Sequence, residues 1–139
     1  MELKECMNFL LSVSQNKVFK YFSKLLEEYG LTPAQYGVLN CLWSEGQLSP
    51  KQIGEFMYLE APTISGILDK MQKAGFIERS VDPENRRNVL VVATQKSMEI
   101  QDKVEGATLQ MNDTALQNLS ASDQAVLMKS LDTIIKSDF

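Results

Sequence analysis

Residues 48–94 read LSPKQIGEFMYLEAPTISGILDKMQKAGFIERSVDPENRRNVLVVAT, and the remainder of the chain is arranged around this segment. Ser49 has the side-chain acceptor of a helix N-cap, and Gln52 stands where a capping box returns a hydrogen bond. Pro50 suits the first helical position, where an N–H group is not needed. A short helix is therefore predicted to begin directly after Ser49.

A second helix is predicted from Pro62 to Ala74, because proline starts helices well but cannot continue one. Its apolar residues recur at spacings of three, four and seven and form one buried stripe: Ile64, Ile67, Leu68 and Met71. The opposite face carries small polar residues first and cations last: Thr63, Ser65, Gly66, Lys70 and Lys73. A helix of this kind can enter the major groove of DNA tip first, with lysines near phosphates.

Two strands are predicted next, at 76–81 and 89–93, because both are rich in β-branched residues and bounded by turn formers. The loop between them is too long for a tight hairpin and too polar for a core, and it carries Arg86 and Arg87. Two helices followed by such a hairpin form a winged helix. An arginine on a thin loop can reach into the minor groove, where a narrow A·T-rich segment concentrates negative potential.

Helices are also predicted on both sides of this unit. One long helix spans 2–29, another runs from Thr32 to about Trp43, and two more begin near Gln95 and Ser120. The apolar face of the first helix is broader than one neighbour in a small monomer would cover, and the last helix repeats the pattern. A dimerisation region explains this, with two-fold symmetry that matches a pseudo-palindromic operator. The alternative is an ordinary buried core helix.

Together these elements resemble the MarR family of transcriptional regulators over nearly the whole chain. The resemblance is carried by Leu31-Thr32-Pro33-Ala34-Gln35-Tyr36, Leu48 to Gly54, Pro62 to Gly75, Arg79, and Asn85-Arg86-Arg87-Asn88-Val89-Leu90. Arg87 matches the wing-tip arginine of the family, whereas Asn85 stands where the family usually has an aspartate. Any carboxylate that braces the wing would then have to come from Glu84 or Asp82.

The resemblance implies a mainly α fold with a small β-hairpin wing, in a single domain of residues 1–139. The winged helix-turn-helix lobe is expected at 31–96, and the helical dimerisation region at 1–30 and 97–139. The implied function is a sequence-specific, double-stranded-DNA-binding regulator that acts as a homodimer and as a repressor, released by a small-molecule or oxidant signal. The alternative is a winged-helix protein-interaction module that does not bind DNA.

The residues expected to contact DNA are Lys51, Pro62, Thr63, Ser65, Gly66, Lys70, Lys73, Arg79, Arg86, Arg87 and Asn88. The lysines could equally be solvated surface charges. For Arg79 the alternative to a phosphate contact is a salt bridge along the strand face to Glu78 or Asp82.

An effector could be sensed in two ways. Four aromatic residues can line a small-molecule pocket between the dimerisation helices and the lobe, with plain core packing as the alternative: Phe9, Phe22, Tyr36 and Trp43. Cys6 can act as a redox sensor, because one branch of the family senses hydroperoxides through a cysteine in the first helix. In that branch a tyrosine follows four residues later, where this chain has Leu10. Cys41, inside an apolar helix, is expected to be a core residue.

Composition narrows the function classes. Residues 51–96 hold seven basic and six acidic side chains, a net charge of +1, whereas residues 97–139 hold three and seven, a net charge of −4. The chain has no histidine, its two cysteines make no zinc site, and it has no glycine-rich phosphate loop or nucleophile elbow. No enzyme activity, metal or cofactor is therefore expected. Without a long apolar run or a signal-peptide pattern, a cytoplasmic protein with no membrane partner is expected.

Overall fold

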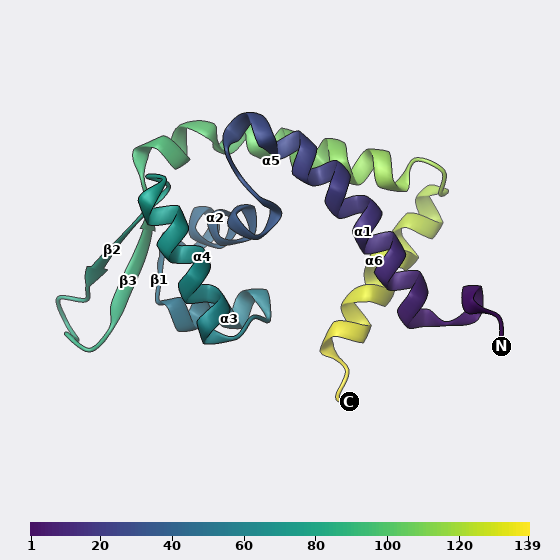
Figure 1. The fold of residues 1–139 in the computed structure, drawn as a ribbon, viewed down its shortest axis with the longest axis horizontal. Coiled ribbons are helices and arrows are strands. Elements are labelled where there is room, and N and C mark those ends of the chain that lie inside the picture. The colour runs from purple at the N-terminus through teal and green to yellow at the C-terminus, as the bar shows by residue number, and fades with distance from the viewer.

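The structure, a computed structural model, describes residues 1–139 and is mainly helical with one small sheet, as the sequence predicted. The elements are η1 (Leu3–Glu5), α1 (Met7–Leu26), η2 (Glu27–Tyr29), α2 (Pro33–Glu45), β1 (Gln47–Leu48), α3 (Pro50–Met57), α4 (Ala61–Lys73), β2 (Ile77–Val81), β3 (Val89–Ala93), α5 (Gln95–Leu116) and α6 (Ala121–Lys136). Figure 1 shows two parts. The lobe consists of α2, α3, α4 and the sheet, and the arm consists of α1, α5 and α6.

The two predicted capping boxes are present and start helices α2 and α3. Thr32 Oγ1 accepts a hydrogen bond from the Gln35 N–H at 3.2 Å, and Gln35 Oε1 accepts one from the Thr32 N–H at 3.1 Å. Ser49 and Gln52 repeat the arrangement at 3.1 and 2.9 Å. These boxes satisfy N–H groups that a helix start otherwise leaves unpaired, so they fix where both helices begin.

The first helix differs from the single helix predicted over 2–29. It is interrupted at Cys6, whose backbone is extended, and the preceding turn η1 is closed by its own hydrogen bond from the Glu2 N–H to Glu5 Oε2 at 2.8 Å. At its other end the helix tightens into η2 and stops at Gly30, which adopts a left-handed conformation with φ of 71°.

The sheet has three antiparallel strands in the order β1-β3-β2, one more than the predicted hairpin. The two-residue strand β1 pairs Leu48 with Val91, on the opposite edge of β3 from β2. Val91 in the central strand is fully buried. A strand of two residues has no alternation to detect, and its pairing with β3 is distant in sequence, so the sequence pattern did not reveal it.

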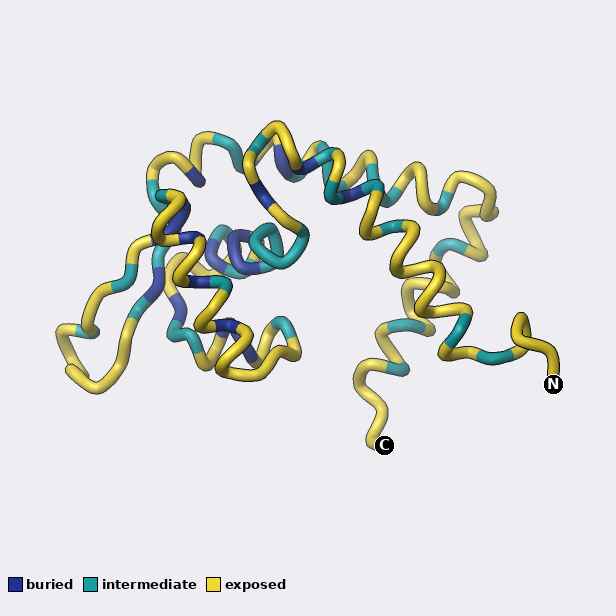
Figure 2. The backbone as a smooth tube through the Cα atoms, in the orientation of Figure 1, coloured by how far each residue is buried: buried dark blue, intermediate teal, exposed yellow.

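The hydrophobic core lies in the lobe and at the junction with the arm (Figure 2). Three of the four residues in the predicted stripe of α4, Ile64, Leu68 and Met71, are at most 1% exposed, and the fourth, Ile67, is half-buried against the same core. Burying each of the first three side chains contributes about 1.5–3 kcal/mol, which holds α4 firmly against the rest of the lobe.

Three side chains near the start of α5 hold three consecutive carbonyl groups beyond the end of α4. The hydrogen bonds run from Lys96 Nζ to the Ala74 oxygen (2.8 Å), from Thr94 Oγ1 to the Gly75 oxygen (2.6 Å) and from Ser97 Oγ to the Phe76 oxygen (2.6 Å). Ser97 is fully buried, and the ammonium of Lys96 also lies 4.3 Å from the centre of the Phe76 ring. We call this contact the α4–α5 joint. It connects α4 directly to the arm.

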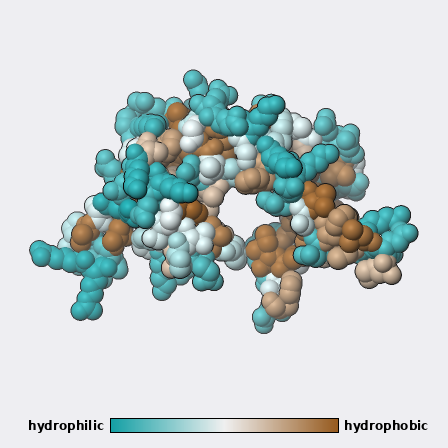
Figure 3. All heavy atoms as spheres, viewed as in Figure 1, coloured by the Kyte–Doolittle hydropathy of each residue, from teal (hydrophilic) through white to brown (hydrophobic).

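The arm leaves much of its apolar surface uncovered. Helix α1 packs against α5, but α6 contains no buried residue. Figure 3 shows hydrophobic atoms gathered on the arm near the two termini. The exposed large apolar side chains of these helices are Met7, Leu10, Leu11, Val13, Phe19, Met98, Leu109, Val126, Leu127, Met128 and Ile135. None of the helices combines the length and apolar character needed to cross a membrane.

Candidate nucleic-acid interface

The outer face of α4 is open and carries small polar groups. Thr63, Ser65 and Gly66 are exposed on the side opposite the buried stripe. A Cβ atom built on Gly66 would meet no other atom within 4 Å, so the helix backbone itself forms the surface here. Lys70 and Lys73 lie in the last turn. Another molecule can therefore approach the first turns of α4 closely, while cations flank the later ones.

A tight turn sets the angle between α3 and α4. Tyr58 is the only residue other than glycine with a positive φ, at 56°, and its N–H donates to the Gly54 oxygen. The Leu59 N–H donates to the same oxygen at 3.0 Å. A Cβ on Gly54 would lie 3.0 Å from the Leu59 oxygen, so this close approach depends on glycine. The helix-turn-helix geometry follows from this turn.

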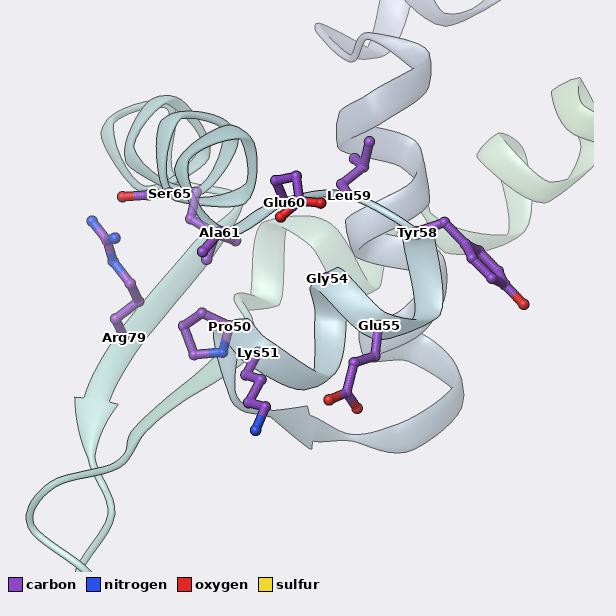
Figure 4. Close-up of a pocket in the computed structure, with 11 residues that line it drawn as sticks. Pro50, Lys51, Gly54, Glu55, Tyr58, Leu59, Glu60, Ala61, Ser65 and Arg79 are labelled. Carbon is purple, nitrogen blue, oxygen red and sulfur yellow. The ribbon is translucent and has the colours of Figure 1, made fainter. Parts of the chain in front are cut away.

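An open cleft of about 630 Å³ lies between α3, the start of α4 and β2 (Figure 4). It brings together three residues that the sequence marked as DNA contacts, Lys51, Ser65 and Arg79. Glu55 and Glu60 line it as well, so its charges are of both signs. In the close-up the guanidinium of Arg79 points toward α4 rather than into solvent.

The wing tip is built from two successive turns closed by side-chain oxygens. Asp82 Oδ1 accepts from the Glu84 N–H at 2.9 Å, and Asn85 Oδ1 accepts from the Arg87 N–H at 3.2 Å. The Asp82 N–H also donates to the Asn88 oxygen at 2.9 Å, which extends the hairpin by one bond. These Asx turns shape the loop without help from any longer side chain.

Neither Glu84 nor Asp82, the two carboxylates left open as a brace for the wing, pairs with a wing arginine. Asp82 is engaged with the backbone instead, and neither Arg86 nor Arg87 forms an ion pair. The amide oxygen of Asn85 accepts a backbone N–H as a carboxylate would, so the wing retains its shape with asparagine there. Both arginine head groups are exposed and available to an anionic partner.

Arg79 has a different partner from those expected. Its Nη2 donates to Asp69 Oδ1 at 2.8 Å and its Nε donates to Gln72 Oε1 at 2.7 Å, both on α4. Glu78 and Asp82, named as the alternative to a phosphate contact, do not pair with Arg79, because successive side chains of a strand point to opposite faces. Arg79 shares its face with the buried Ile77 and is directed at α4, whereas Glu78 is exposed on the other face.

Three of the four aromatic residues assigned to a pocket lie together. The ring centres of Phe22 and Tyr36 are 5.3 Å apart, and those of Tyr36 and Trp43 are 6.4 Å apart, all edge to face. Phe9 lies thirteen residues before Phe22 on the same helix, about 20 Å away along its axis. It therefore does not belong to the cluster. Trp43 Nε1 is buried without a hydrogen-bond partner, and so is Ser23 Oγ, a residue that the sequence did not single out.

The two cysteines are both partly exposed and unpaired. Cys6 lies at the break before α1, and the nearby Lys4 is already paired with Glu2 at 3.1 Å. Cys41 packs against the core, as predicted, and burial raises the pKa of its thiol. No group of histidine, cysteine, aspartate and glutamate residues is arranged to hold a metal ion.

Comparison with known proteins gives a consistent result. The model of the MarR family matches residues 31–89. The organic hydroperoxide resistance transcriptional regulator of Bacillus subtilis is 29% identical over 140 residues, which cover 99% of this chain and 92% of the relative. A probable transcriptional regulator from Pseudomonas aeruginosa superposes with a TM-score of 0.89 at 28% identity, covering 96% of this chain and 99% of that one. A mutant MarR from E. coli, solved in complex with operator DNA, shares the fold, with a TM-score of 0.86 at 21% identity and 92% coverage of each chain.

Proposed function

The chain belongs to the MarR family, and on that premise we propose that it binds specific sequences of double-stranded DNA as a homodimer and regulates transcription. The main support for the proposal is the surface of the lobe. It presents an open, small-residue helix face on α4 together with two arginines, Arg86 and Arg87, that have no ion-pair partner at the tip of the wing.

The roles follow from the chemistry of each group. Pro62 begins α4, and Thr63, Ser65 and Gly66 meet base edges in the major groove, where short hydroxyl side chains allow close approach. Arg87 enters the adjacent minor groove, with Arg86 and Asn88 beside it. Lys51, Lys70 and Lys73 contact phosphates and so position the protein without specifying sequence. Arg79 lies at the edge of the same cleft, at the base of the wing.

A second copy of the chain is proposed to cover the arm. The uncovered apolar side chains of α1, α5 and α6 support this, because apolar patches of this extent mark interaction sites. A two-fold dimer carries two lobes, and its operator would have half-sites about 34–36 Å apart, one turn of the double helix. Such a protein works where the DNA is, in the cytoplasm.

We further propose that the protein is a repressor released by a small molecule held near Phe22, Tyr36 and Trp43. A buried polar group without a partner, Trp43 Nε1, supports this proposal because a bound acceptor would satisfy it. An oxidant acting at the partly exposed Cys6 is the alternative signal, favoured by the similarity to a hydroperoxide resistance regulator. If an aromatic compound still releases a Cys6→Ser variant from DNA, the signal is the small molecule and not an oxidant acting at Cys6.

A salt titration of DNA binding tests the proposed function. For the duplex upstream of its own gene, the logarithm of affinity should fall steeply with the logarithm of salt concentration, as counterions are released. Arg87→Ala should weaken sequence preference by about 1–3 kcal/mol, because it removes a minor-groove contact. Lys70→Ala should weaken binding to all sequences alike and reduce the salt slope by about one.

The control is Lys103→Ala, an exposed cation on the arm, which should leave binding unchanged. If alanine at both Arg86 and Arg87 left binding of the natural partner intact, the protein would instead be a protein-interaction module. Such a module has no need of arginines at the wing tip.

A further inference from the structure

Arg79 connects the wing to α4 through two hydrogen bonds, to Asp69 at 2.8 Å and to Gln72 at 2.7 Å. We propose that these three residues, the Arg79 bridge, are positioning residues that hold the wing at the angle from which Arg87 reaches the minor groove while α4 lies in the major groove. The inference rests on the proposed DNA binding, and it assigns to Arg79 the orientation of the wing instead of a phosphate contact.

The geometry of the bridge fixes an orientation as well as a distance. Nε and Nη2 lie on one edge of the planar guanidinium, and they donate to acceptors one helical turn apart on the same side of α4. A planar fork held at two points cannot rotate about either bond. A lysine at this position would supply a charge but could not supply this constraint.

The direction of the wing is determined at its base, where β2 and β3 join the rest of the lobe. In the three-stranded sheet, β1 pairs only with Val91 and Val92, and Arg79 pairs with Val91 at the level of Leu48, where β1 ends. Beyond Arg79 the wing is a two-stranded ribbon with an exposed Val81. Such ribbons are marginally stable alone, so their direction is determined where they join the body. The hydrogen bonds of Arg79 are the only polar side-chain contacts between β2 and α4.

The charge on Arg79 is already compensated. Its partner Asp69 is 56% exposed and would face the same DNA backbone as Arg79, so the pair attracts a phosphate less than a free arginine does. Arg86 and Arg87, by contrast, have no carboxylate partner. An ion pair as exposed as this adds little to stability. Positioning is the role that remains for it.

A double-mutant cycle between Asp69 and Arg87 tests the inference. The probe is a duplex selected by the wild-type protein from a random pool. In the wild-type background Arg87→Ala should weaken binding about tenfold. In an Asp69→Ala background the same change should weaken binding less than about twofold. Without the bridge the wing no longer places Arg87 in the minor groove, so removing Arg87 costs little. Asp69→Ala alone should leave the slope of affinity against salt unchanged.

Three further variants sharpen the cycle. Gln72→Ala removes the other acceptor and should reduce the effect of Arg87→Ala in the same way. Asp69→Asn keeps the acceptor oxygen, so in that background Arg87→Ala should again weaken binding about tenfold. The matched control is Asp132→Ala, which removes an equivalent ion pair on α6, at 2.9 Å and with 57% exposure, and should leave the tenfold effect intact. Thermal unfolding of each variant reports whether the fold is retained.

The outcomes are distinguishable. If Arg87→Ala costs the same in the wild-type and Asp69→Ala backgrounds, the inference is overturned while DNA binding stands. Tighter binding by Asp69→Ala would also overturn it, since that result means that Arg79 contacts a phosphate once freed from its carboxylate. If the wild-type protein selects no sequence from the pool, the proposed function itself has failed.

Discussion

Gly66 occupies a position where alanine would make a better helix. It lies inside α4, on the exposed face, with open space where a Cβ atom would stand. A glycine in such a position costs about 0.5–1 kcal/mol relative to alanine. Gly106 is in the same situation inside α5, also exposed and with open space beside it. The two glycines are therefore matched positions for comparison, one on the proposed DNA-binding face and one on the arm.

We expect Gly66→Ala to stabilise the protein by about 1 kcal/mol and to weaken its binding to operator DNA, because the added methyl group occupies the space where α4 meets the base edges. Gly106→Ala should give a similar stabilisation with unchanged DNA affinity. Thermal unfolding and a binding titration on the same samples measure both quantities. Equal affinity of Gly66→Ala and wild type would show that α4 does not approach DNA by this face.

The placement of several residues was predictable from the sequence, and that of others was not. The exposed face of α4 follows from a repeat of about 3.6 residues, so Thr63, Ser65 and Gly66 were placed correctly on the surface. The alternation of β2 would also have shown that Arg79 faces inward with Ile77, away from Glu78. No sequence pattern, however, could show that Asn85 replaces a carboxylate by accepting the Arg87 N–H.

At the scale of elements, strong local signals explain what the sequence could predict. The capping boxes of α2 and α3, the buried stripe of α4 and the β2–β3 hairpin each depend on residues close together in the chain. The features that were missed depend on distant contacts or on single backbone angles. They are the strand β1, which exists through its pairing with β3, and the break at Cys6 before α1.

The capping box of α3 should have a measurable effect. Ser49→Ala removes the acceptor of the Gln52 N–H, and the free energy of unfolding should fall by about 1 kcal/mol. Ser49→Asp, which retains an acceptor, should restore most of it. Denaturant unfolding with an unchanged m-value measures the difference. A loss below about 0.3 kcal/mol would mean that water replaces the cap without cost.

At the scale of the whole molecule, the chain has a well-covered lobe and a poorly covered arm. The lobe contains most of the buried residues, whereas α6 contains none. Charge follows this division only in part: residues 51–96 carry a net charge of +1 and residues 97–139 one of −4, whereas α1 in the arm is basic, with Lys17, Lys20 and Lys24. The acidic segment 97–139 is repelled by the DNA backbone, which favours contact through the lobes.

The protein is expected to be a dimer at micromolar concentration, because the apolar side chains of α1, α5 and α6 need a partner surface. Light scattering or analytical ultracentrifugation measures the mass directly. Val126→Glu, an exposed apolar position on α6, should shift the protein toward the monomer, whereas Lys129→Glu on the same helix should have little effect. A stable wild-type monomer would contradict the proposed role of the arm.

The α4–α5 joint couples the orientation of α4 to that of the arm. Because three consecutive carbonyls beyond its C-terminal end are held by α5, α4 cannot tilt independently of the arm. At about 1.5 Å per residue, a helix of thirteen residues is about 20 Å long, so a rotation of about 10° at the joint displaces its far tip by about 3 Å. That displacement is as long as a hydrogen bond. A small bend in the arm would thus be enough to remove all the proposed base contacts of α4 at once.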